Sequence, residues 1–255
     1  MRGQVSVTLV AEQHPRGITL QAVGTEFTNW GVQPSFIART HCLDRSIDLW
    51  KPQREGEALP PGTHAFPFAI ELPPTLPPSF DGLLTEIGYG LKAKVDLPRH
   101  VDLHAEAGFI VVATLPAVED KPVHIEARDD TGRYMALDLP RTVYRLGQTI
   151  EGVVHLTRPR EARARRLTVE LLSRERGNAQ GVWTDYVERE ADVRIELEHV
   201  VEDSAYPFTF KLPDSAAPTY SGEHSELSWR VVARLDAPRS PDLIAEAGIV
   251  VGEVG

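Results

Sequence analysis

The chain has few of the features that mark secreted or membrane proteins. Among its 255 residues there is one cysteine, Cys42, so no disulfide can form within the chain. A lone cysteine fits a reducing compartment, and we expect a cytoplasmic protein. No hydrophobic run reaches the roughly 20 residues that a membrane-spanning helix needs. The first residues, Gln4–Leu9, alternate as a strand does and do not form the apolar core of a signal peptide.

The sequence also lacks the common catalytic motifs. It contains no Gly-x-Ser-x-Gly elbow, phosphate-binding loop, dinucleotide fingerprint or His-Glu-x-x-His pair. His100 and His104 would lie roughly 13 Å apart on a strand, too far for one metal ion. Cys42 has no CxxC partner, so we expect a small buried apolar side chain and not a nucleophile. We predict no catalytic residue, no metal and no cofactor, and therefore a protein that is not an enzyme.

The charge of the chain is acidic, with one basic stretch. The formal net charge is −10, which argues against binding to the phosphates of nucleic acids. The candidate partner-binding residues are the arginines of the basic stretch, Arg160, Arg163, Arg165 and Arg166. Guanidinium groups suit phosphate or carboxylate recognition. The other interpretation, which stays open, is a solvated loop that pairs with acidic residues such as Glu188, Glu190 or Glu196.

One long stretch of the chain occurs twice. Every position from Phe66 to Gly108 pairs without a gap with a position 140 residues later, so that Ala105–Gly108 and Ala245–Gly248 both read Ala-Glu-Ala-Gly. The repeat is too long for a solenoid unit and indicates two domains of one fold. We expect a first domain at 1–116 and a second at 117–255, joined by a short linker at Leu115–Pro122.

The repeat shows the alternation of half-buried strands. Phe66, Phe68 and Ile70 share one face of an extended segment, and Ile87 and Tyr89 do the same in the next. The sequence therefore predicts an all-β fold of two tandem antiparallel immunoglobulin-like β-sandwiches, without a long helix. Its expected strands include 36–41, 46–50, 181–189 and 192–199. A last strand of the first domain is expected at Gly108–Thr114, with Phe109–Val112 buried.

The motifs of the first copy resemble those of the arrestin N-terminal domain. They are Leu59-Pro-Pro-Gly62, Phe66-Pro67-Phe68, Leu72-Pro73, Pro78-Ser-Phe-Asp-Gly82 and Ile87-Gly-Tyr89. The second copy, preceded by Tyr144–Gly152, is similar to the arrestin C-terminal domain. The structural signature residues are Gly62, Phe66, Pro67, Phe68, Gly82, Tyr89, Tyr206, Pro207, Phe208, Gly222 and Trp229.

The resemblance implies a cytoplasmic adaptor or scaffold in protein transport or signalling. Such a protein would bind a peptide or the tail of a membrane protein through sheet edges, cupped sandwich faces and the groove between the domains. Ala105–Val112 lacks the arginine expected on the last strand of the first domain, so the chain is more similar to bacterial sporulation-control arrestin-like proteins than to receptor-switched arrestins. The alternative function is a small-molecule or carbohydrate-binding sandwich with Trp30, Trp50 or Trp183 as stacking surfaces.

The two copies differ at their beginnings. Pairing Gly3 with Gly152 leaves Tyr134–Gly147 ahead of the second copy and only Met1 and Arg2 ahead of the first. The first domain therefore lacks the opening strand of the second. One interpretation is that the sequence given does not start where the natural chain does. The other is that the unfilled edge accepts a strand from a partner or from a second copy, which would make a homodimer.

Overall fold

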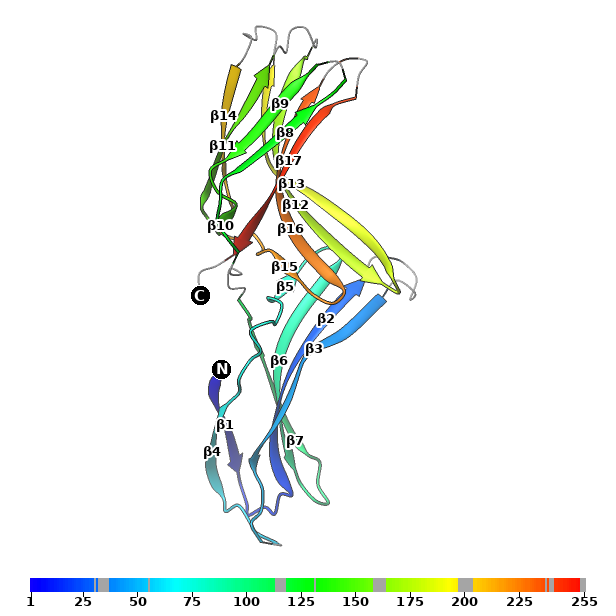
Figure 1. Ribbon diagram of the computed structural model, residues 1–255. Helices are drawn as coiled ribbons and strands as arrows, with labels where there is room; N and C mark the ends of the chain where they lie inside the picture. The colour runs from blue at the N-terminus through cyan, green and yellow to red at the C-terminus, as the bar shows by residue number, and fades with distance from the viewer. Residues whose placement is uncertain are drawn as a thin grey trace. The chain divides into compact units, whose positions relative to one another are not determined.

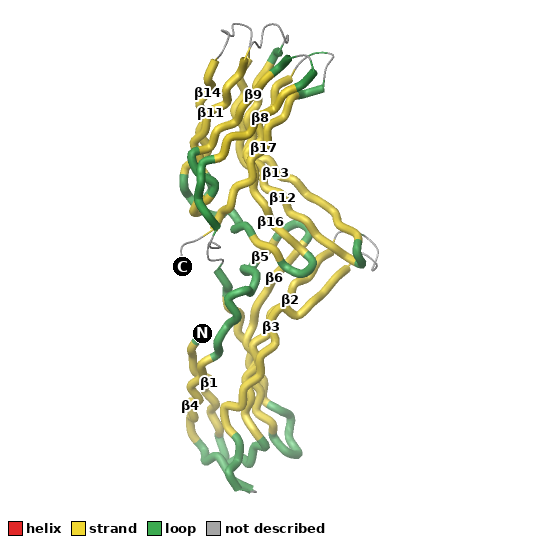
Figure 2. Tube along the Cα trace, viewed as in Figure 1, coloured by secondary structure: helices red, strands yellow, loops and turns green. Residues whose placement is uncertain are grey.

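The computed structural model consists of strands and loops. It describes residues 1–29, 31, 37–54, 56–112, 118–130, 132–157, 164–196, 204–236, 238 and 241–252, and these ranges contain no helix (Figure 2). No described segment is therefore a helix that could cross a membrane. The chain divides into two compact units, Met1–Val111 (domain one) and Val112–Gly255 (domain two). The expected boundary at 116/117 falls among residues 113–117, outside the described residues, and stays a prediction.

Domain one consists of a large sheet and a two-stranded sheet (Figure 1). The large sheet has the order β3-β2-β6-β5, and β7 pairs with β6 on the same edge as β5, opposite β2. The small sheet pairs β1 with β4 in antiparallel register, Val5 opposite Phe66. The strands are β1 (Arg2–Leu9), β2 (Gly17–Asn29), β3 (Ile37–Trp50), β4 (Gly62–Ala69), β5 (Phe80–Asp81), β6 (Thr85–Asp96) and β7 (Leu103–Phe109).

Domain two has the same plan with more strands. Its large sheet has the order β10-β17-β16-β12-β13, with β15 beside β16, and its second sheet has the order β14-β11-β9-β8. All pairs are antiparallel except β10 with β17. The strands are β8 (Val123–Arg128), β9 (Tyr134–Leu139), β10 (Val143–Arg145), β11 (Thr149–Thr157), β12 (Arg166–Ala179), β13 (Val182–Glu196), β14 (Ser204–Lys211), β15 (Tyr220–Ser221), β16 (Ser225–Asp236) and β17 (Leu243–Gly252). The predicted all-β fold of antiparallel sandwiches is confirmed.

The core of domain two follows from the alternation of its strands. Along β11, Ile150, Val154 and Leu156 are at most 1% exposed, while Glu151, Val153 and His155 face outward. The inward residues of both sheets form one cluster that also holds Phe208 and Trp229. Because burying each large apolar side chain contributes about 1.5–3 kcal/mol, this shared face holds the two sheets together. Domain one has a smaller cluster of the same kind around Val7, Leu9 and Ile18.

The duplication extends to individual hydrogen bonds. Tyr89 donates its hydroxyl to the carbonyl of Pro77 at 2.6 Å, and its counterpart Trp229 donates Nε1 to the carbonyl of Ala217 at 3.0 Å. Both side chains are buried.

Two of the signature glycines match as well. The amide of Gly82 donates to the carbonyl of Thr85 at 2.9 Å, and that of Gly222 donates to the carbonyl of Ser225 at 2.7 Å. Gly62 has a φ of 131°, which an L side chain rarely adopts. Tyr89 and Gly82 therefore make the same kinds of hydrogen bond as their counterparts Trp229 and Gly222.

Two predicted strand breaks are wrong. Residues 37–50 form the single strand β3, and residues 182–196 form the single strand β13. In β3 the pairing with β2 shifts where Gly24 faces Leu43 and Thr25 faces His41, leaving Cys42 without an opposite residue. A β-bulge of the same kind in β13 leaves Glu190 without an opposite residue in β12. A bulge changes the phase of the alternation without ending the strand.

The expected last strand of domain one is also wrong. It was predicted at Gly108–Thr114, with Phe109–Val112 buried, but β7 ends at Phe109 and Ile110 is 80% exposed. In domain two the counterparts Val250–Gly252 continue β17 because β10 pairs with them. No described strand takes the place of β10 in domain one, so Ile110–Val112 have no strand to pair with in the described structure.

Candidate functional site

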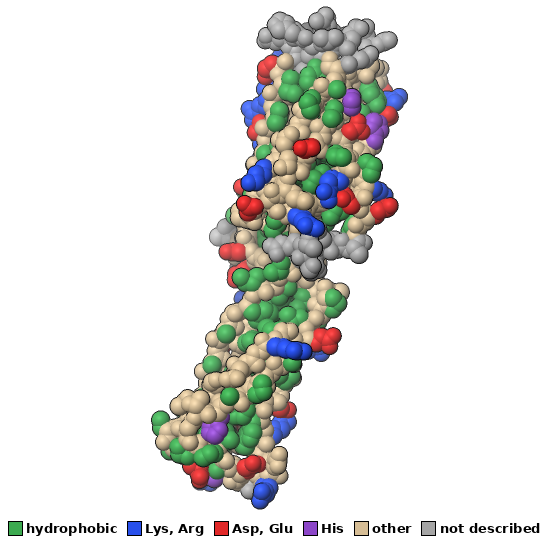
Figure 3. All heavy atoms as spheres, turned by 90° about the vertical axis from the view of Figure 1, so that its left-hand side faces the viewer, with side chains coloured by type: hydrophobic (Ala, Val, Ile, Leu, Met, Phe, Trp, Pro, Cys, Tyr) green, Lys and Arg blue, Asp and Glu red, His purple; other side chains and the backbone are tan. Residues whose placement is uncertain are grey.

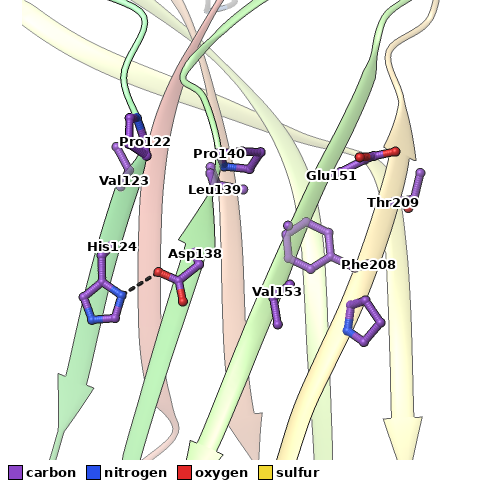
Figure 4. Close-up of a pocket in the computed structure, with 12 residues that line it drawn as sticks. Pro122, Val123, His124, Asp138, Leu139, Pro140, Glu151, Val153, Phe208 and Thr209 are labelled. Atoms are coloured by element: carbon purple, nitrogen blue, oxygen red, sulfur yellow. Dashed lines mark hydrogen bonds and ion pairs between the residues drawn. The ribbon is translucent and has the colours of Figure 1, made fainter.

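The outer face of the sheet β14-β11-β9-β8 contains a hollow of about 640 Å³. We call it the outer-face hollow. Its lining comes from all four strands and the prolines at their ends: Pro122, Val123, His124, Asp138, Leu139, Pro140, Glu151, Gly152, Val153, Pro207, Phe208 and Thr209. Figure 4 shows His124, Asp138, Val153, Glu151 and Thr209 spread across these neighbouring strands.

The floor of the hollow is set by the register of the strands. Val153 lies opposite both Pro207 of β14 and Asp138 of β9, so these three side chains share the outer face. Phe208, whose side chain is 4% exposed, belongs to the core beneath. An apolar centre on a solvent-facing sheet is unusual, because the outer positions of an antiparallel sheet are normally polar. Figure 3 faces this side of the domain and shows hydrophobic side chains beside histidine and carboxylate groups.

A row of polar side chains borders the hollow on the β8 side. His124 Nδ1 lies 2.5 Å from Asp138 Oδ1, and His155 Nε2 lies 3.2 Å from the other oxygen of that carboxylate. His124 Nε2 lies 3.4 Å from Glu126, which also accepts a hydrogen bond from the hydroxyl of Tyr134 at 2.9 Å. The row therefore connects β11, β9 and β8 across the outer face.

The hydrogen bonds within the row shift the pKa values of His124 and Glu126. The hydrogen bond with Asp138, and then that with Glu126, raises the pKa of His124 above its usual value. The pKa of Glu126 is lowered, first by the hydroxyl of Tyr134 and then by His124. These charges are exposed, so they give the rim a polar character and little rigidity.

The described side chains of the row do not form the pair of a base and a nucleophile that covalent catalysis needs. The hydrogen bonds of His124 go to Asp138 and Glu126, so in the described structure no hydroxyl or thiol pairs with this imidazole. Among the described residues no group of three or more His, Cys, Asp or Glu side chains could hold a metal ion.

The predicted basic site is only partly described. Arg160 and Arg163 lie outside the described residues. The exposed Arg165 donates its amide to the carbonyl of Asp236 at 2.9 Å, and Arg166 lies 3.6 Å from the carboxylate of the same residue. Neither arginine lines the outer-face hollow. Arg166 therefore lies beside Asp236 of the neighbouring strand β16 and opposite Glu196 of β13, so this arginine has acidic neighbours as the second interpretation expected; a role of the stretch in partner binding stays a prediction.

The tryptophans do not form a shared stacking surface in the described structure. Trp229 is 3% exposed, and Trp183, although 42% exposed, has the guanidinium carbon of Arg176 at 4.7 Å from its ring centre. Trp50 packs against the core of domain one, and Trp30 lies outside the described residues. The described tryptophans therefore give little support to the expected stacking surface for a carbohydrate.

The outer-face hollow was not predicted from the sequence. Pro207 and Phe208 were predicted as signature residues, whereas Val153, His124 and Asp138 were not. The signal was present in part, since alternation along 149–157 puts Val153 on the outward face between Glu151 and His155. What the alternation could not reveal is the register that aligns Val153 with Pro207 and Asp138.

Comparison with known proteins agrees with the fold. Residues 1–117 match the family model described as "Arrestin (or S-antigen), N-terminal domain". The chain is 24% identical over 257 residues to arrestin domain-containing protein 15 of Caenorhabditis elegans, an alignment that covers 91% of this chain and 67% of the relative. It is 48% identical over 100 residues to arrestin domain-containing protein 1 of Rattus norvegicus, which covers 39% of this chain and 22% of the relative.

These matches agree with two structural observations, the duplicated sandwich and the matching hydrogen bonds of its signature residues. The family match falls on domain one, and the first relative aligns across both domains. Together with the all-β architecture they show that residues 1–117 are similar to the arrestin N-terminal domain and that the chain is similar to arrestin domain-containing proteins.

Proposed function

We propose that this protein is a non-enzymatic adaptor that holds an extended segment of a protein partner against the outer-face hollow of domain two. The observation that carries the proposal is the apolar centre at Val153 and Pro207 on a sheet face that is otherwise polar. An apolar patch with a polar rim is typical of protein interaction sites. The arrestin-like family consists in general of adaptors, which supports the same conclusion.

The polar rim defines the segment that would fit. Asp138 and Glu151 put carboxylates on the border of the hollow, while His124 and Thr209 offer hydrogen bonds. A partner segment with an apolar side chain between polar or basic ones would place the apolar group over Val153 and the basic group beside a carboxylate. In the described structure β14 and β8 are the edge strands of this sheet, so their outer edges are further positions at which an extended chain can add.

Several finer features belong to the same proposal. We place the protein in the cytoplasm, because its single cysteine suits a reducing compartment, and we assign it to protein transport or signalling through such partners. Arg165 and Arg166 would add contacts with acidic or phosphorylated segments. Binding of a small molecule is the second candidate, since 640 Å³ lies within the range of ligand pockets.

The test is affinity capture from the source cell with mass spectrometry, using the full chain and two variants. Val153→Arg puts a charge in the centre of the hollow on the outer face. Val182→Arg is the control, because Val182 is an apolar residue of the other sheet and is 52% exposed. We expect proteins captured by the wild type and the control to be lost with Val153→Arg. Identical capture by all three proteins would exclude the hollow as the binding site.

A further inference from the structure

The two histidines of the polar row share one carboxylate at the border of the outer-face hollow. His124 Nδ1 lies 2.5 Å from one oxygen of Asp138, and His155 Nε2 lies 3.2 Å from the other (Figure 4 shows the first pair). The histidines come from β8 and β11, the strands on either side of β9, which holds Asp138. Both imidazoles are about half exposed and can exchange protons with the solvent. The charge of this border therefore depends on two side chains of the type that ordinarily titrates between pH 5 and 8.

The register of the sheet sets the distance of these groups from the apolar centre of the hollow. Asp138 lies directly opposite Val153, and His124 lies opposite Asp138 on the next strand. His155 is two residues beyond Val153 on β11, so both side chains point to the outer face. Neighbouring strands are about 4.8 Å apart and alternate residues about 6.8 Å, so both imidazoles lie within about 10 Å of a group bound over Val153. Because the Debye length at physiological salt is about 8 Å, their charge changes the potential at the centre.

While both imidazoles are neutral, the border of the hollow is acidic. The carboxylates of Asp138 and Glu151 line it, and the described lining contains neither lysine nor arginine. Glu126, the next outward residue of β8, lies 3.0 Å from the guanidinium of Arg128 and so adds little net charge. The hollow is therefore complementary to an apolar side chain that is accompanied by a basic one.

The other charged groups around the row lie further away or pair with one another. On β14 the charged side chain of the outer face is Lys211, the last residue of the strand. Arg141 follows the lining residue Pro140 and pairs with Asp120 at 2.9 Å, and Lys121 precedes the lining residue Pro122 and lies 3.8 Å from Glu119. From within the sandwich, β17 packs against β8 and β9 through apolar side chains. The two imidazoles are therefore the groups of this border that ordinarily gain charge between pH 8 and pH 5.

Proton uptake by both imidazoles removes the acidic character of the border. Protonated His124 donates to Asp138 and to Glu126, and protonated His155 lies against the second oxygen of Asp138. The two added positive charges equal the two negative charges of Asp138 and Glu151. The hydrogen bond with Asp138, and then that with Glu126, raises the pKa of His124, so its proton uptake begins closer to neutral pH. Acidification therefore removes the attraction for a basic group.

We propose that the outer-face hollow binds a basic segment of a partner protein near neutral pH and releases it when His124 and His155 are protonated. The proposal rests on the adaptor function and specifies the charge of the partner segment and the condition of its release. An acidic segment would instead bind better at acidic pH, so the two classes of partner respond in opposite directions. By linkage, a bound basic segment lowers the pH at which the two imidazoles take up protons.

The experiment is an NMR titration of the full chain with peptides at about pH 7.5 and at about pH 5.5, on either side of the usual imidazole titration. The basic peptide is acetyl-Gly-Arg-Ser-Leu-Ser-Arg-Gly-amide, which in extended form has its leucine and both arginines on one face. Two control peptides have glutamine or glutamate in place of both arginines. The amide shift of Val153 gives the dissociation constant. The variants are His124→Gln with His155→Gln, at half-exposed positions where the fold tolerates them, and His104→Gln, at an exposed histidine of domain one, as the matched control.

We expect the basic peptide to bind the wild type and His104→Gln about tenfold more weakly at the lower pH, because two charges are added within about 10 Å. The double histidine variant should bind it equally at both pH values. Absence of binding by the basic peptide, tighter binding of the glutamate peptide at the higher pH, or an unchanged pH dependence in the double variant would overturn the proposal. The adaptor function can survive that result, because the capture experiment with Val153→Arg depends neither on pH nor on the charge of the partner.

Discussion

One pair of substitutions compares the same side chain in two environments. Leu103→Ala and Leu243→Ala remove the same atoms from equivalent positions of β7 and β17, but Leu103 is 44% exposed and Leu243 is 7% exposed. Truncation of a buried leucine costs about 2–5 kcal/mol, part of which arises from the cavity left behind. Leu243 packs within the main core of domain two, so we expect its loss to cost about 3 kcal/mol.

The cost at Leu103 should be much smaller. Only part of this side chain is removed from water, and truncation at an open surface leaves no closed cavity, so the loss is about 1 kcal/mol. Differential scanning calorimetry of the full chain measures both effects. For domains of this size we expect the affected transition to move down by about 10 °C with Leu243→Ala and by about 3 °C with Leu103→Ala. Equal shifts would refute the reasoning, because they would mean that β7 is covered in solution as β17 is.

Two further predictions concern the signature residues and the polar row. Tyr89→Phe removes the hydroxyl that bonds the carbonyl of Pro77 and should destabilise domain one by about 1–3 kcal/mol in urea unfolding, whereas Tyr186→Phe, at a side chain 39% exposed, should leave the midpoint unchanged; equal midpoints for the two variants would contradict this. Asp138→Asn removes the main cause of the raised pKa of His124, so NMR titration should show a lower midpoint for that imidazole. Since the raised pKa stabilises the protonated form, the contribution of the pair to stability is present at acidic pH and is lost as the pH rises through the pKa of folded His124. An unchanged midpoint in the variant would show that Asp138 is not the cause.

Much of the fold could be predicted because the sequence carries its pattern twice. The alternation in Phe66–Ile70 identified strands with one buried face, and the copy around Tyr206 showed that the pattern was not accidental. The predicted breaks in 37–50 and 182–196 fell beside the bulged residues Cys42 and Glu190, where the phase of the alternation changes. Periodicity alone cannot distinguish a change of phase from the end of a strand.

The candidate sites were harder to predict because they depend on pairing between distant strands. The outer-face hollow requires Val153 to meet Pro207 and Asp138, and that register is set by cross-strand packing rather than by local sequence. The prediction that Phe109–Val112 are buried was wrong for a related reason. Those residues have the composition of a covered strand, but in the described structure their side of domain one has no counterpart of β10 or β9.

The most direct measurement of the central asymmetry is amide hydrogen exchange by NMR on the full chain, comparing Gln4–Thr8 of β1 with Val153–Thr157 of β11. In β11, Val153–Leu156 lie between two paired strands and Thr157 pairs with β9, so Val153–Leu156 should all be protected. In β1 we expect an alternating pattern, with the amides that point away from β4 exchanging at least about 100-fold faster than those bonded to β4. Uniform protection along Gln4–Thr8, equal to that of β11, would contradict the account, because it would show that the edge of β1 is already paired.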